Sequence, residues 1–67
     1  MSDKVAMLTF DEKTAVNNFM VNFMRANIDS EVKFVKARRE KGYLKVTISR
    51  NGIEDWYHVK DNGFTWY

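Results

Sequence analysis

The sequence predicts an α+β fold in which one amphipathic helix packs on an antiparallel meander of three to four strands. Three features predict it: apolar residues at helical spacing over residues 10–26, alternation of apolar and polar residues over 43–50, and Asn-Gly pairs at 51–52 and 62–63. The first spacing is typical of a helix, the second of a half-buried strand, and Asn-Gly of a tight hairpin turn.

A short apolar run over residues 4–10, KVAMLTF, precedes the predicted helix. Periodicity does not distinguish a buried strand from the start of the helix in so short a run. We expect a short leading strand, which would give the element order β-α-β-β-β-β.

The helix is expected over about residues 10–26. Thr9 and Glu12 fit a capping box, in which the Thr9 hydroxyl caps the first turn and the Glu12 carboxylate reaches back to the backbone. Asn27, a residue that tolerates left-handed backbone, is expected to end the helix. The side chains expected to face the core are Ala15, Val16, Phe19, Met20 and Phe23.

The two Asn-Gly pairs fix which residues of the meander face each other. A two-residue loop at Asn51-Gly52 pairs Arg50 with Ile53, and one at Asn62-Gly63 pairs Val59 with Trp66. Since side chains alternate along a strand, this register sorts the aromatic residues between the two faces. It sends Ile53, Tyr57, Val59, Phe64 and Trp66 toward the helix with Leu44, Val46 and Ile48, and Trp56, His58 and Tyr67 away from it.

The strand at residues 31–40, EVKFVKARRE, is ambiguous. A two-residue loop at Lys41-Gly42 places Val35 and Ala37 on the core side, which leaves Phe34 pointing the other way. Either a β-bulge switches the faces within this strand or Phe34 is exposed. The sequence leaves both alternatives open.

The 67 residues are expected to form one small globular domain, residues 1–67, of marginal stability. The chain has no Cys and one His, which excludes disulfides, thiolate metal sites and multi-histidine metal sites. No cofactor is implied, so the domain must rely on packing or self-association. No apolar run approaches the roughly 18 residues of a membrane span. The first residues lack a signal-peptide pattern, so we expect a cytoplasmic protein without membrane contact.

The sequence contains no catalytic constellation, so we expect a binding protein and no enzyme. Nucleophilic catalysis needs a nucleophile beside an oriented base, and the only imidazole, His58, has Lys45 and no carboxylate opposite it in the predicted register. Glu54 and Asp55 are adjacent in a strand and therefore point to opposite faces. The three glycines lie in turns and form no phosphate-binding loop, so no small-molecule substrate is implied.

The sheet face away from the helix is the candidate binding site. Seven of the eleven basic residues lie within residues 31–50, and the register places aromatic rings beside them. Bases stack on aromatic rings at roughly 1–3 kcal/mol each while cations hold the phosphates, so this pattern favours single-stranded nucleic acid or RNA. The candidate contact residues are Tyr43, Lys45, Trp56, His58, Lys60 and Tyr67, joined by Lys36 and Arg38 if the ambiguous strand places them there.

The same residue types also favour a protein interface, because Trp, Tyr and Arg dominate binding hot spots. The alternative is therefore a protein–protein interaction module: a small regulator or inhibitor of a larger protein, or a homodimer through the sheet face. In size and composition the chain resembles small accessory proteins encoded by bacteriophages. A third interpretation is ordinary cross-strand pairing, with Lys and Arg protecting the sheet edges and no partner.

Overall fold

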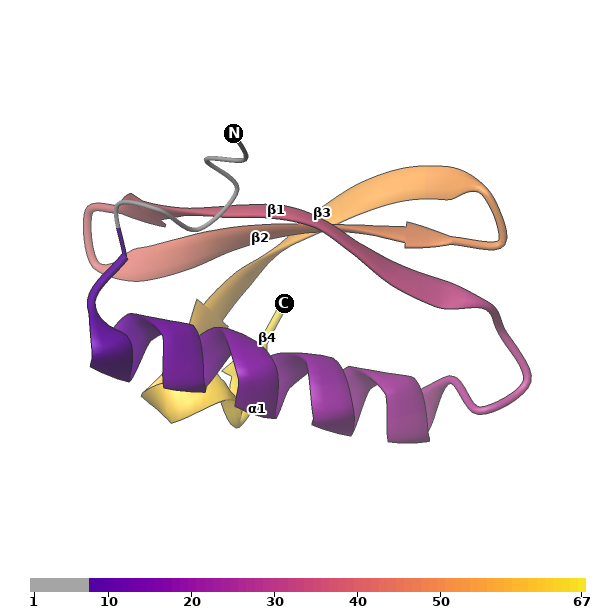
Figure 1. Cartoon of the computed structure of the whole chain (residues 1–67), viewed down its shortest axis with the longest axis horizontal. Coiled ribbons are helices and arrows are strands. Elements are labelled where there is room, and N and C mark those ends of the chain that lie inside the picture. Colours follow the sequence, from indigo (N-terminus) through magenta and orange to yellow (C-terminus); the bar gives the residue numbers. More distant parts are fainter. Residues whose placement is uncertain (1–7) are drawn as a thin grey trace.

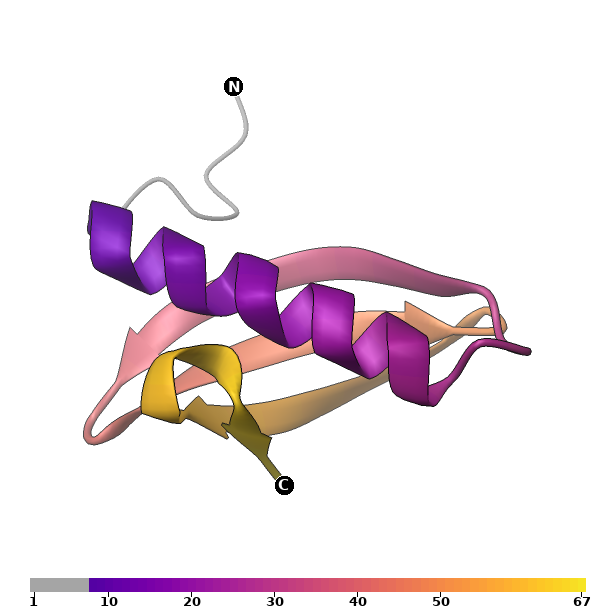
Figure 2. The same ribbon diagram turned by 90° about the horizontal axis from the view of Figure 1, so that it is seen from below.

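The computed structural model describes residues 8–67 and confirms the α+β arrangement. The elements are α1 (Phe10–Ala26), β1 (Val32–Glu40), β2 (Tyr43–Arg50), β3 (Ile53–Lys60), a 3-10 turn η1 (Asp61–Gly63) and β4 (Thr65–Trp66). The strands form one antiparallel sheet in the order β1-β2-β3-β4, and α1 lies across one of its faces (Figure 1; Figure 2).

The expected leading strand over residues 4–10 falls mostly outside the described residues, which begin at Leu8. Leu8 and Thr9 are not in a strand, and Phe10 already begins α1. The described part of this run therefore leads into the helix, and Leu8 contributes a buried side chain to the core.

The predicted ends of α1 are confirmed, although its C-terminal cap differs from the expected one. The capping box is present: the Glu12 N–H donates to Thr9 Oγ1 at 3.1 Å, and the Thr9 N–H donates to Glu12 Oε1 at 2.8 Å. Asn27 ends the helix with φ −126°, outside the left-handed region. Its side-chain Nδ2 donates to the Phe23 carbonyl at 2.9 Å, so the amide satisfies an end carbonyl without left-handed backbone.

The predicted pairing of β2 with β3 is confirmed. Asn51 and Gly52 form the turn with φ of 53° and 83°, and the register runs from Arg50–Ile53 to Leu44–Val59. The turn is also tied to the α1–β1 connection, because the Asn51 side chain accepts from the Glu31 N–H at 2.9 Å and the Asn51 N–H donates to the Glu31 carbonyl at 2.8 Å.

A β-bulge resolves the ambiguity in β1. Phe34 pairs with Ile48 and Lys36 with Thr47, so Val35 is the extra residue. The bulge places Phe34 on the helix side with Ala37, where Phe34 is half-buried and packs against the core. Since a bulge switches the alternation for the residues that precede it, it also sends Lys33 to the opposite face, whereas the Lys41-Gly42 turn already places Lys36 and Arg38 there.

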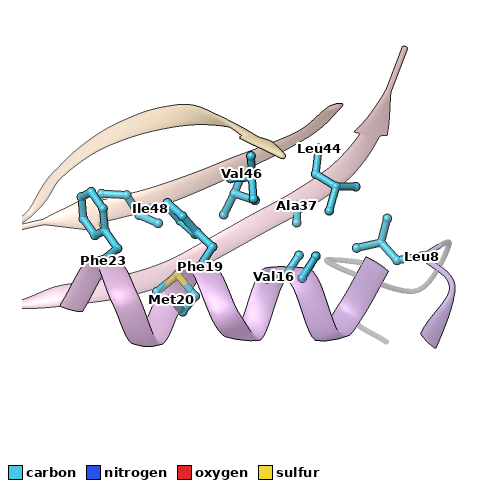
Figure 3. Close-up of a cluster of buried hydrophobic side chains, with 11 residues drawn as sticks. Leu8, Val16, Phe19, Met20, Phe23, Ala37, Leu44, Val46 and Ile48 are labelled. Carbon is cyan, nitrogen blue, oxygen red and sulfur yellow. The ribbon is translucent and has the colours of Figure 1, made fainter. Parts of the chain in front are cut away.

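The core lies between α1 and the sheet, as the helical stripe predicted (Figure 3). Phe19, Val46 and Ile48 have no exposed surface. The Phe19 ring lies 5.3 Å from Phe23, 6.0 Å from Tyr57 and 5.4 Å from Trp66, measured between ring centroids. The predicted core stripe of the helix is buried throughout: Ala15, Val16, Phe19, Met20 and Phe23.

Two residues predicted to point inward are exposed instead. Ile53 is 73% exposed, because the twisted tip of the β2–β3 hairpin curves away from α1 and leaves the residue without a covering layer (Figure 1). Phe64 is 63% exposed. It has helical backbone angles, φ −95° and ψ −8°, so it lies in the turn and not in β4, and the alternation of a strand does not apply to it.

The turn at Asn62-Gly63 does more than reverse the chain. It keeps the predicted pairs Val59–Trp66 and Lys60–Thr65, and three successive residues, Asp61 to Gly63, have positive φ. Gly63 is buried against α1, with the Asn18 amide donating to the Asn62 carbonyl at 2.9 Å. The turn therefore also docks on the helix.

An ion pair joins the start of α1 to β1. Arg39 Nε lies 2.6 Å from Glu12 Oε2, and Arg39 Nη2 lies 2.6 Å from Glu12 Oε1, which is a bidentate contact. The hydrogen bond from Arg39, together with that from the Thr9 N–H, lowers the pKa of the Glu12 carboxyl from its usual 4.5 to about 2. The same pairing raises the pKa of Arg39.

This ion pair predicts how stability changes in acid. Because the folded-state pKa of Glu12 is depressed, its stabilising effect is present above its unfolded pKa of 4.5 and is lost as pH falls toward 2. Glu12→Gln, which keeps an acceptor for the capping box, is expected to flatten the fall of Tm across this range in circular-dichroism melts. Parallel curves for Glu12→Gln and wild type would contradict the assignment.

Candidate nucleic-acid interface

The sheet face turned away from α1, here called the outer face, is built by the strand register. Its residues are Lys33, Lys36, Arg38 and Glu40 from β1; Tyr43, Lys45, Thr47 and Ser49 from β2; Glu54, Trp56, His58 and Lys60 from β3; and Thr65 and Tyr67 at β4. All eight predicted contact residues lie on this face. The register of the Lys41-Gly42 turn, with Glu40 opposite Tyr43, brings Lys36 and Arg38 there.

Three aromatic side chains cluster around the His58 ring. The His58 ring lies 4.4 Å from Tyr43, 4.9 Å from Trp56 and 4.7 Å from Tyr67, and it is stacked on Tyr67 with an interplanar angle of 6°. The register explains the cluster, because His58 and Trp56 alternate along β3 while Tyr43 and Tyr67 come from the strands on either side. We call these four residues the aromatic cluster.

Backbone and side-chain hydrogen bonds hold the cluster in place at β4. The His58 N–H donates to the Tyr67 carbonyl at 2.9 Å, and the Tyr67 N–H donates to the His58 carbonyl at 3.1 Å. His58 Nδ1 lies 3.2 Å from the same Tyr67 carbonyl oxygen. Since a carbonyl oxygen only accepts, this contact favours the tautomer with the proton on Nδ1.

The cluster keeps a substantial exposed surface. Trp56 is 43% exposed and Tyr67 is 62% exposed, while His58 and Tyr43 are half-buried beneath and between them. One side of the Tyr67 ring is against His58, so its exposed surface includes the opposite side. Tyr57 and Trp66 instead pack on Phe19 and Phe23 in the core, which confirms their predicted inward orientation.

The cations on the outer face differ in whether they contact an aromatic ring, a carboxylate or neither among the described residues. Lys45 Nζ lies 4.6 Å from the centroid of the Trp56 ring, a cation–π contact. Arg38 forms an ion pair with Glu40 on the same strand. Within residues 8–67, Lys36 and Lys60 form no ion pair. The outer face thus combines five cationic side chains with two carboxylates, Glu40 and Glu54.

A shallow hollow of about 290 Å³ lies at the junction between cations and rings on the outer face. Its floor is Thr47, which is only 7% exposed although it lies on the outer face. The other lining residues are Lys36, Lys45, Glu54, Asp55 and Trp56. The hollow therefore brings two ammonium groups, two carboxylates and an indole ring to the same small volume.

Sequence reasoning missed the role of Glu40 on this face, whereas it did place Thr47 there. Glu40 neutralises part of the Arg38 charge, and the Arg-x-Glu spacing, which puts both side chains on one face of a strand, was the available signal. Thr47 forms the floor of the hollow, and its position opposite Trp56 followed from the register.

Three further features of the described residues bear on function. A hollow of about 480 Å³ beside the start of α1 is lined by the Glu12–Arg39 pair and by Asp61, whose carboxylate is bonded to Thr65. Residues 8–67 bring no three metal-ligating side chains together. No helix among them has the length and apolar character needed to cross a membrane.

Comparisons with protein-family models, with curated proteins and with solved structures return no match for this chain. The chemistry of the outer face is therefore the guide to function.

Proposed function

We propose that this chain is a non-enzymatic module that binds single-stranded nucleic acid through the outer face. The observation that carries the proposal is the aromatic cluster lying directly beside cations on one sheet face. Exposed rings offer stacking surfaces to bases of any sequence, and cations offer contacts to the phosphates that accompany every base. A protein surface that served only to stabilise the sheet would not need Trp56 and Tyr67 to remain so exposed.

Single strands suit this surface better than duplexes. In a duplex the flat faces of the bases are stacked on each other and closed to protein rings, whereas unpaired bases can be splayed onto a platform. The outer face is a sheet without a protruding helix or loop among residues 8–67 that could enter a groove (Figure 1). We therefore expect a preference for single-stranded RNA or DNA with little sequence selectivity.

The direct test is a titration of a fluorescein-labelled mixed-sequence 12-nucleotide RNA at low salt, followed by fluorescence anisotropy. Saturable binding that weakens steeply as salt rises is expected, because phosphate contacts release counterions. The same oligonucleotide as DNA and as a duplex completes the series. No binding of any of the three at tens of micromolar protein would overturn the proposal. Sedimentation of the protein alone distinguishes the alternative, in which the outer face pairs two copies of the chain.

Trp56→Ala is expected to separate binding from folding. The side chain is 43% exposed, and a cross-strand aromatic pair contributes at most about 1 kcal/mol, so the free energy of unfolding should change little. Affinity for the labelled RNA should fall roughly 5- to 150-fold if one base stacks on the indole. Urea unfolding and the anisotropy titration measure the two effects. A large loss of stability with unchanged affinity would mean that Trp56 belongs to the core, which contradicts its place on the outer face.

A further inference from the structure

Most cations of the outer face lie on β1 and most of its rings on the far side of the sheet, with Lys60 on β3 and Tyr43 on β2 as the exceptions. The edge strand β1 carries Lys33, Lys36 and Arg38, while the aromatic residues Trp56, His58 and Tyr67 lie on β3 and beside β4. Lys45 on β2 lies between the two groups, with its ammonium over Trp56. The face therefore has a cationic side and an aromatic side, joined at the hollow over Thr47.

The width of this arrangement matches one nucleotide. Neighbouring strands are about 4.8 Å apart, so β1 and β3 are separated by roughly 10 Å. A nucleotide extended across the sheet has its phosphate at one end and its base at the other. A separation of roughly 10 Å therefore lets the phosphate lie over the cations of β1 while the base lies over the rings of β3. Along β1, residues two apart, such as Lys36 and Arg38, are separated by about 6.7 Å, which suits successive phosphates of an extended strand.

From this separation we propose that the bound strand runs along β1, with its phosphates over Lys36 and its neighbours and its bases crossing β2 to stack on Trp56 and Tyr67. The inference rests on the proposed function and adds the orientation of the bound strand, with its phosphates over β1 and its bases over β3. Lys36 becomes the principal phosphate contact, because it forms no ion pair within residues 8–67, whereas Arg38 is shared with Glu40 and Lys33 lies 3.6 Å from Glu31. Tyr67 becomes a stacking surface, since the side away from His58 is open.

The two kinds of contact leave different signatures in a salt titration. A phosphate contact contributes to the slope of log K against log salt, about 0.7 per contact for single strands, whereas stacking lowers affinity equally at all salt concentrations. Measuring anisotropy of the labelled RNA at several salt concentrations therefore assigns each residue to phosphate or base.

Lys36→Gln is expected to reduce the magnitude of that slope by about 0.7. Lys13→Gln is the matched control, because Lys13 is an exposed residue of α1 on the other side of the molecule and the change in net charge is the same. Its slope should equal that of the wild type. Tyr67→Leu should weaken binding roughly 5- to 150-fold with the slope unchanged. Urea unfolding of each variant verifies that it is folded before titration.

The outcomes separate this inference from the function on which it rests. Suppose that the wild type binds but Lys36→Gln and Lys13→Gln have the same slope, or that Tyr67→Leu lowers the slope. The proposed orientation of the strand is then wrong, while nucleic-acid binding stands. If the wild type binds neither RNA nor DNA, both proposals fall. Equal affinity for the duplex and the single strands would also overturn the proposed orientation, because paired bases cannot stack on Tyr67.

Discussion

Gly63→Ala is expected to lower the free energy of unfolding by roughly 2–5 kcal/mol, the sum of a left-handed backbone cost and an overpacking cost. Gly63 has φ +93°, and a Cβ added there would lie 2.2 Å from the Ala15 carbonyl oxygen and 2.8 Å from the Phe19 nitrogen. These are backbone atoms of α1, so neither moves without displacing the helix. The turn would have to lift away, weakening the Asn18–Asn62 hydrogen bond and the packing of Trp66. Urea unfolding followed by circular dichroism measures the loss.

Gly52→Ala is the matched control for this substitution. Gly52 has nearly the same backbone conformation, φ +83°, in the other Asn-Gly turn, but nothing lies within 4 Å of its added Cβ. It should therefore show only the backbone cost, about 1–2 kcal/mol. Equal losses for the two variants would mean that η1 does not dock closely on α1.

Phe19→Ala is expected to cost roughly 3–5 kcal/mol, the range for truncating a buried aromatic side chain. The Phe19 ring has no exposed surface and contacts the rings of Phe23, Tyr57 and Trp66, so its removal opens a cavity at the centre of the aromatic core. At about 0.05–0.15 kcal/mol per residue, a domain of this size has a total stability of only a few kcal/mol to about 10. The variant should be largely unfolded at room temperature by circular dichroism.

Phe10→Ala provides the comparison on the same helix. Phe10 is 82% exposed at the first position of α1, so its truncation removes an equal number of atoms without opening a cavity. Its melting temperature should stay close to that of the wild type. Comparable destabilisation by the two substitutions would contradict the assignment of the buried stripe.

Local sequence signals predicted the parts of this fold that local geometry determines. Thr9 and Glu12 mark the start of α1, and Asn51-Gly52 fixes the register of β2 with β3, because a capping box and a type of turn depend only on neighbouring residues. Ile53 shows the limit of this reasoning. Alternation specifies which face a side chain occupies but not whether the helix extends far enough to cover it, and at Ile53 it does not.

The bulge in β1 depends on the whole fold. The apolar pattern of EVKFVKARRE allows a bulge but does not require one. Packing between the helix and the sheet decides the matter, because α1 can bury Phe34 only if the alternation switches. The docking of Gly63 on Ala15 is likewise a contact between distant segments. The sequence of the turn predicted its pairing but not its partner.

The sequence predicted which residues lie on the outer face but not how their side chains contact one another. Trp56, His58 and Tyr67 were assigned by alternation alone, and the structure brings them into contact around one imidazole ring. The register of the Lys41-Gly42 turn placed Lys36 and Arg38 on this face. Engagement of Arg38 by Glu40 depends on side-chain conformation, which residue spacing suggests but does not determine.

The docked turn has a consequence for how the chain folds. Each hairpin closes between neighbours and can form early, but the bond from Asn18 to Asn62 joins residues 44 positions apart. Closing so long a loop costs chain entropy before any contact repays it, which slows folding compared with a helical domain of equal size. The contact between Phe19 and Trp66 likewise joins residues far apart in the sequence and requires the same loop closure. The meander alone therefore cannot hold a native core, and we expect helix, sheet and terminal turn to be gained and lost together as one cooperative unit.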